Sequence, residues 1–313
     1  MFALIFLMYQ YLAQRLLLAI PVVLCVTAVV FAILQLVPGD PVRIMAGNRA
    51  SEERLDEIRA QLGLDQPIAT QYGRWLGQIL QGDMGVSIAL KRPVAEIIGE
   101  RFPFTLRLTL TALVVSLLLG IPLGVVAATQ HNQWLDYLVS YLSLFWFSMP
   151  GFWLGMMLIV IFGIRLRWTP ISGHEGAMAL VLPTLTLSLP QMGALTRLTR
   201  SAMLEVLGEE YIVVARAKGL PLWLVYFRHA LRNALIPITT LLFLSLPLLF
   251  GGAVIIETIF AWPGIGRLMY DALLKKDFPI VQGLLLIFAL STVVANILGD
   301  MVAARLDPRI THS

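Results

Sequence analysis

The side chains that most often carry catalysis are few and scattered in this sequence. No G-x-x-x-x-G-K-[ST] loop, His-Glu-x-x-His helix or G-x-S-x-G elbow occurs. The run Pro263-Gly264-Ile265-Gly266 lacks the lysine and the strand and helix context of a phosphate-binding loop. The histidines are isolated from one another, as surface or interfacial histidines usually are: His131, His174, His229 and His312. We therefore expect no catalytic residue, no metal site and no cofactor bound by this chain.

Ionisable residues inside a membrane span would indicate a proton or ion pathway. Glu257 and Asp300 instead lie at the ends of apolar stretches, where we expect a solvated or structural role. Cys25 is the only cysteine, and it lies within an apolar run where packing is its expected role. A single cysteine can form neither an internal disulfide nor a thiolate metal cluster. The sequence thus gives little support to an ion-coupled pump or carrier.

The composition indicates a polytopic membrane protein. Of 313 residues, 58% are hydrophobic and 13% charged, whereas soluble domains are about 45–50% apolar and about 25% charged. A membrane helix needs about 20 apolar residues, and six stretches qualify: Leu16–Val37, Leu108–Thr129, Tyr137–Ile164, Ala177–Leu195, Ala234–Ile256 and Phe278–Gly299. The predicted fold is all-α with six transmembrane helices. The net charge of +4 is too small and too dispersed to suggest nucleic acid.

The apolar stretches divide the chain into three parts. Residues 1–37 form the N-terminus and a retained first helix, because its uncharged run is too long for a removable signal. Residues 38–104 form a polar region with two amphipathic helices, one capped by Ser51 and ended by Gly63, the other near Gln71–Leu80. Residues 105–313 form the core transmembrane domain, in which Met149-Pro150-Gly151 predicts a kink.

Lysine and arginine in short loops predict the orientation. The loop 196–233 carries six of them: Arg197, Arg200, Arg216, Lys218, Arg228 and Arg232. Arg15 and the C-terminal Arg305 and Arg309 are expected on the same side. This distribution favours a cytoplasmic loop 196–233, cytoplasmic termini and an external region 38–104.

Within this loop, the stretch from Gly208 to Pro221 carries its own helix start and stop signals. Glu209 and Glu210 lie in the first turn and Arg216 and Lys218 in the last, each matched to the helix dipole. Gly219 suits the left-handed position after the helix, and Pro221 bars its continuation. The pattern predicts a helix over Glu209–Lys218.

This short helix has apolar side chains on more than one face, namely Tyr211, Ile212, Val213 and Val214. A helix of about three turns is marginal in water by itself. Its own bundle, the membrane surface or a partner must therefore cover these side chains. Burying each one against a partner gains roughly 1.5–3 kcal/mol, which is enough for several of them to hold a docked protein.

The run Glu210–Leu220, followed by His229–Pro237, resembles the EAA-type loop of permease subunits in bacterial ATP-binding-cassette importers, particularly the dipeptide, oligopeptide and nickel branch. The matching motifs extend along the chain: Val37–Val42, Gly82–Ser87, Arg92–Val94 with Thr105-Leu106, Glu257–Arg267 and Asp307–Ile310. Val213 and Val214 stand where the general pattern has Glu and Ala. This departure excludes a loop carboxylate at position 213 and is typical of the peptide branch.

The resemblance implies a type I importer permease fold in the bacterial inner membrane and a protein that is not itself an enzyme. It also implies partners: a second homologous permease, two cytoplasmic ATPases that bind ATP and Mg, and an extracytoplasmic solute-binding protein. The lipid bilayer surrounds the spans. The residues implied to dock the ATPase are Glu210, Tyr211, Val214, Ala215, Arg216, Lys218 and Gly219. The resemblance also implies that Pro237 begins the fifth span, and it assigns no residue to the substrate pathway.

The implied function is ATP-driven import by alternating access. Peptides, nickel chelates and glutathione are all substrates of this branch, and selection lies largely with the binding protein. An ion-coupled secondary transporter is the alternative, and a membrane scaffold or assembly factor is a second one. Transport by the isolated chain without ATP would favour the first alternative, and copurification without any ATPase would favour the second.

Overall fold

The computed structural model describes residues 17–32, 42–43 and 51–306. Arg15, Arg309, the tail motif Asp307–Ile310 and most of the motif Val37–Val42 lie outside the described residues. The described part of the chain is helical and contains no β-strand beyond an isolated bridge between Val86 and Pro93. The expected all-α class is therefore confirmed.

The helices run in the following order. The first helix, Leu17–Ala32, precedes α3 (Glu52–Leu62), α4 (Ile68–Leu80), α5 (Val94–Thr129), α6 (Trp134–Ser148) and α7 (Gly151–Leu158). Then follow α8 (Val181–Leu207), α9 (Glu210–Ala217), α10 (Leu222–Leu224), α11 (Leu231–Ile259), α12 (Ile265–Leu274) and α13 (Phe278–Leu306). Short π-helical stretches extend α7 (Ile159–Arg165) and link α10 to α11 (Val225–Ala230), and a 3-10 turn (Ala177–Leu180) leads into α8.

Several helices have the length and apolar character of membrane spans. Among the described residues these are Val94–Thr129, Ala177–Leu207 and Phe278–Gly299, and the bent pair of Trp134–Ser148 with Gly151–Arg165 counts as a fourth. The 29 residues of α11 contain the predicted fifth stretch. The first helix lies within the predicted Leu16–Val37. The total of six spans stays a prediction.

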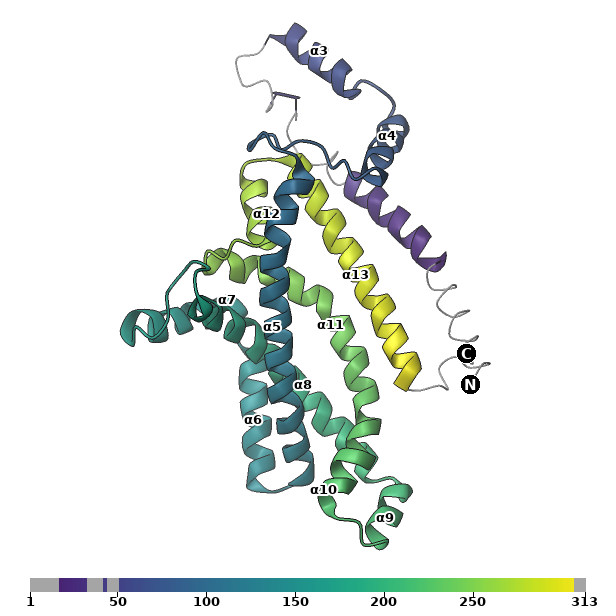
Figure 1. Cartoon of the computed structure of the whole chain (residues 1–313), viewed down its shortest axis with the longest axis vertical. Coiled ribbons are helices and arrows are strands. Elements are labelled where there is room, and N and C mark those ends of the chain that lie inside the picture. The colour runs from purple at the N-terminus through teal and green to yellow at the C-terminus, as the bar shows by residue number, and fades with distance from the viewer. Residues whose placement is uncertain (1–16, 33–41, 44–50, 307–313) are drawn as a thin grey trace.

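The kink expected at Met149-Pro150-Gly151 is a sharp break. The α6 and α7 axes differ in direction by 100°, so α7 projects sideways from the bundle (Figure 1). Met149 is extended (φ −77, ψ 129), as expected for a residue whose α conformation is disfavoured by the proline that follows it. The predicted interruption is therefore confirmed.

Two helices are longer than the spans predicted for them. Polar residues in the additional parts lower the hydropathy there, so the sequence pattern did not include these parts. The helix α5 begins at Val94, inside the region 38–104 that the sequence assigned to an external segment. Arg92 pairs with Glu96 at 2.8 Å and Glu100 at 2.6 Å along this first part of α5. The helix α8 continues through residues 196–207, which the sequence assigned to a loop.

The helix that contains the predicted fifth span begins before Pro237, and where the span itself begins stays a prediction. Pro237 lies inside α11, and helical backbone already runs from Leu222 through the π-helical stretch into that helix. Arg228, His229 and Arg232 lower the apolar character of this first part, which therefore has the composition of a loop.

Close packing between α5 and α8 occurs at glycines. A side-chain carbon added at Gly120 would contact Leu195 and Met192, and one added at Gly124 would overlap Thr196 and Thr199. The two helices therefore approach as closely as they do because these positions lack a Cβ atom.

We expect Gly124→Ala to destabilise the protein by about 1–3 kcal/mol, because overpacking forces neighbouring atoms apart. Thermal unfolding of the purified protein in detergent measures the change. Gly99→Ala is the matched control, since it lies on the same helix with no atom near the added carbon, and it should be neutral or slightly stabilising. Equal effects of the two variants would contradict the packing argument.

Several short helices lie at the two ends of the molecule, whereas α7 projects from its side (Figure 1). The helices α9 and α10 lie at one end, and α12, α3 and α4 lie at the other. The predicted caps of α3 are present: Ser51 accepts from Arg54 N, and Gly63 is left-handed with φ 66. The helix α4 packs on the first helix, where the Tyr72 and Thr27 hydroxyls are 2.8 Å apart and the Tyr72 ring meets Phe31.

Candidate functional site

The α9 helix has the local structure that its sequence predicts. It spans Glu210–Ala217, with Glu209 and Lys218 as its caps, in place of the expected Glu209–Lys218. Gly219 follows in the left-handed conformation with φ 73, and its N–H donates to Arg216 O at 2.9 Å. Gly219 therefore ends the helix as expected, and Pro221 precedes the new helical segment at Leu222.

One face of α9 packs against the bundle. Ile212 is fully buried and Ala215 is 7% exposed. They share an apolar cluster with residues of α5, α8 and the α10–α11 junction, among them Val125, Met203 and Val225. Ala215, one of the residues expected to dock a partner, therefore faces the protein's own core and is not accessible on the surface.

The opposite face of α9 is open and largely apolar. Val213 is 60% exposed and Val214 52%, and Glu210 and Ala217 are exposed on the same side. Val213 and Ala217 were not among the expected docking residues. The 100° rotation per residue identifies them once Ile212 and Ala215 are known to face inward. We call Glu210, Val213, Val214 and Ala217 the outer face.

The remaining expected docking residues border this outer face. Tyr211 is 42% exposed, and Asn233 of α11 donates a hydrogen bond from Nδ2 to its hydroxyl at 2.6 Å. Arg216, Lys218 and Gly219 are exposed. A partner bound to the outer face would therefore contact a helix that is tied directly to α11.

The packing of α9 determines where its displacement is felt. Its buried face contacts α5, α8 and the α10–α11 junction, and closely packed interiors transmit strain. The α11 helix then runs 29 residues away from α9, which is about 43 Å at 1.5 Å per residue. This geometry can transmit a displacement of α9 through α11 to the far end of the molecule.

An ion pair fastens α6 to α8 near the α9 end. Arg200 binds Asp136 through two nitrogens, with Nε to Oδ1 at 2.5 Å and Nη2 to Oδ2 at 2.8 Å. Asn132 N donates to the same carboxylate at 3.0 Å, and Ser140 Oγ donates at 3.3 Å. The Asp136 side chain is 2% exposed and that of Arg200 29%. The sequence had placed Arg200 in a loop and gave no signal for this pairing.

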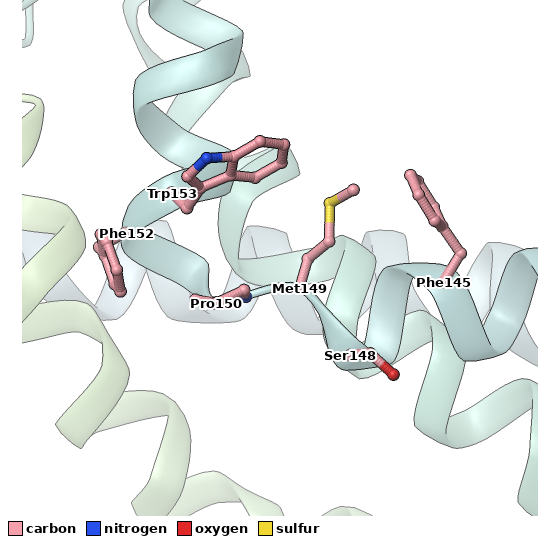
Figure 2. A pocket seen from close by; sticks show the side chains of 6 residues that line it. All are labelled: Phe145, Ser148, Met149, Pro150, Phe152 and Trp153. Atoms are coloured by element: carbon pink, nitrogen blue, oxygen red, sulfur yellow. The ribbon is translucent and has the colours of Figure 1, made fainter.

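Two hollows flank the bend between α6 and α7. One of about 450 Å³ is lined by aromatic and apolar side chains. In Figure 2, Phe145, Met149 and Trp153 point to the same side of this bend. The other, of about 320 Å³, lies between α7, α8 and α11 and includes Thr186 and Gln191. Gln191 Nε2 donates to Ser245 Oγ on α11 at 2.9 Å.

Comparisons with known proteins agree along nearly the whole chain. Residues 120–312 match the family described as binding-protein-dependent transport system inner membrane component. Residues 8–109 match the family of its N-terminal region. The chain is 40% identical over 305 residues to the glutathione transport system permease protein GsiC of Salmonella paratyphi A, covering 97% of this chain and 100% of the relative. The protein of the same name from Escherichia coli strain K12 is 38% identical over the same lengths.

Solved structures agree with the fold. The methionine ABC transporter MetNI in an inward-facing conformation has a chain that matches with a TM-score of 0.59 and 19% identity. The match covers 67% of this chain and 96% of that one. A second crystal form of the same transporter gives a TM-score of 0.58.

Proposed function

This chain belongs to the family of binding-protein-dependent transport system inner membrane components, and from that membership we propose how it works. It is a permease subunit of an ATP-binding-cassette importer and a multi-pass protein of the bacterial inner membrane. Such importers work with ATPase subunits and a solute-binding protein. An ion-coupled secondary transporter is not favoured.

The finer assignment is that α9 docks an ATPase. The observation that carries it is the outer face, where Val213 and Val214 remain exposed on a helix whose other face is packed. Burying such side chains gains roughly 1.5–3 kcal/mol each. Glu210 lies on the outer face itself and Tyr211, Arg216 and Lys218 border it, so these four side chains supply polar contacts. Gly219 shapes the turn that follows.

The α9 end then faces the cytoplasm together with both chain termini, and the α12 end faces outward. One ATPase grips α9 of this chain, and a second grips the corresponding helix of a second, homologous permease. ATP and Mg bind on these ATPases. ATP binding closes the ATPase pair, α9 moves with it, and the spans rock to open the pathway outward; hydrolysis resets them.

The substrate proposed is glutathione or a related short peptide. The support is the name of the relatives, which are 38–40% identical over the full length of the chain. The binding protein performs most of the selection, so this permease needs only to admit a small polar solute.

Reconstitution of the copurified complex tests this function. Liposomes with ATP inside and the binding protein outside should accumulate labelled glutathione or a dipeptide. Omitting either ATP or the binding protein should abolish the uptake. Mass spectrometry of the ligand carried by the purified binding protein identifies the substrate. Uptake by the isolated chain down an ion gradient, without ATP, would refute the proposal.

A further inference from the structure

A buried carboxylate joins three helices at the α12 end. Glu257, two residues before the end of α11, is fully buried. It accepts a hydrogen bond from Thr105 Oγ1 of α5 at 2.5 Å and from Arg267 N of α12 at 2.9 Å. Of the two roles expected for Glu257, solvated or structural, the structure therefore supports the structural one.

Thr105 completes the link between α5 and α12. Its hydroxyl oxygen accepts from Ile265 N at 2.8 Å while its proton is donated to Glu257. Thus the backbone N–H groups in the first turn of α12, which no helix can satisfy internally, bind side chains of α5 and α11. Nearby, Trp262 Nε1 donates to Phe104 O at 3.0 Å and adds a further bond to α5.

The glycines of the Trp-Pro-Gly-Ile-Gly run make room for this carboxylate. A carbon added at Gly264 would overlap the Glu257 carboxyl group, and one added at Gly266 would press on both Glu257 and the backbone of Val254. Neither glycine is needed for a left-handed backbone, because neither has a positive φ. These positions therefore require glycine for close approach.

A second buried carboxylate fixes the other end of α12. Asp277 is 1% exposed and accepts from Ser87 Oγ at 2.5 Å, Ala89 N at 3.0 Å and Ile88 N at 3.1 Å. Between the two carboxylates, an apolar cluster packs α12 against α5 and α13. The loop before α5 is thereby fastened to one end of α12, and Thr105 of α5 is fastened to the other.

Burial of a carboxylate costs several kcal/mol, and well-packed apolar side chains are often at least as stable. The network around Glu257 is satisfied only when α5, α11 and α12 occupy one relative position. Glu257 also lies at the end of α11 opposite to α9, so it stands where a displacement of α11 reaches α5 and α12. A buried carboxylate at this position is therefore suited to hold α5, α11 and α12 in one relative arrangement.

We propose that Glu257, acting through Thr105, is a positioning residue for transport that makes the external ends of α5, α11 and α12 move as one unit. The displacement that starts at α9 then opens the external side as a whole. This inference rests on the proposed ATP-driven function and on the outward placement of the α12 end.

The test compares Glu257→Gln, Thr105→Val and their combination in the complete complex in liposomes. Each single variant should lower ATP-dependent uptake by about tenfold, the size expected from losing a charge-assisted hydrogen bond. The basal ATPase rate should stay within about twofold. Since both residues act through one network, the double variant should be no worse than the poorer single variant.

Two further threonine variants serve as controls. Thr105→Ser keeps the hydroxyl, so its uptake should stay within about twofold of the native rate. Thr111→Val removes a hydroxyl of α5 that donates within its own helix, to Arg107 O, and should leave uptake unchanged. These controls distinguish the loss of the Thr105–Glu257 hydrogen bond from a general effect of any substitution in α5.

Three results would overturn the inference: native uptake in both single variants, parallel loss of uptake and basal ATPase activity, or losses that multiply in the double variant. The proposed function fails in a different way. In that case the native complex itself would not take up solute when ATP and the binding protein are supplied.

Discussion

Val214→Asp should reduce ATP-dependent uptake by about tenfold or more while the chain stays in the membrane. Val214 is 52% exposed on the outer face of α9, so the protein itself tolerates a carboxylate there. A docked ATPase would bury that position. It would lose roughly 1.5–3 kcal/mol of apolar burial, which corresponds to about 10- to 100-fold in affinity, and it would have to desolvate a charge.

The measurement pairs solute uptake with the amount of ATPase that copurifies with the tagged permease. Val214→Ala is the graded control, because it removes only part of the apolar contact and should cost much less. Val86→Asp places the same substitution at a residue that is 55% exposed and precedes Ser87, which binds Asp277 at the α12 end, and it should retain the ATPase. Full ATPase retention by Val214→Asp would show that α9 is not the docking element.

Gly219→Pro tests the proposed docking role of α9 through the backbone. Proline requires φ near −65°, whereas Gly219 has φ 73 and its N–H is bonded to Arg216 O. The substitution should displace the end of α9 and uncouple uptake from ATP hydrolysis. Gly219→Asn is the matched control, since Asn tolerates the left-handed region far better than other side chains, and it should preserve most of the uptake.

The local chemistry of α9 could be predicted from the sequence because each signal acts within a few residues. Carboxylates in the first turn, cations in the last and Gly219 after the helix depend only on the helix itself. Which face is open depends on neighbours far along the chain. Ala215 was expected at the surface, yet it shares a buried cluster with Met203 and Val225, whereas Val213 lies on the open face.

The hydrogen bonds around Glu257 could be predicted from the sequence even less, because they join residues far apart in the chain. The motif Glu257–Arg267 was visible in the sequence, but the 10-residue helix Ile265–Leu274 was not predicted. Thr105 lies 152 positions before Glu257, and no local pattern connects them. Hydropathy also missed the first part of α5, because Glu96 and Glu100 interrupt its apolar character while they bind Arg92.

Arg200→Met should destabilise the protein by about 3–5 kcal/mol, the usual cost of leaving one member of a buried ion pair alone. Asp136 would keep the bonds from Asn132 N and Ser140 Oγ and the contact with His131 Nδ1 at 3.4 Å, but it would lose both bonds from the guanidinium, and only 2% of its side chain is exposed. Thermal unfolding of the purified protein in detergent measures the loss. The variant should also loosen α6 from α8 near α9.

The partner substitution should cost less, because the two side chains differ in their access to solvent. Asp136→Asn leaves the charge on Arg200, whose side chain is 29% exposed and can turn toward water, and Asn keeps an acceptor for Asn132 N. The double variant Asp136→Asn with Arg200→Met removes both charges and should recover most of the stability lost by Arg200→Met alone. If the two single losses simply add in the double variant, the carboxylate at position 136 does not depend on Arg200, and α6 is held to α8 by apolar packing instead.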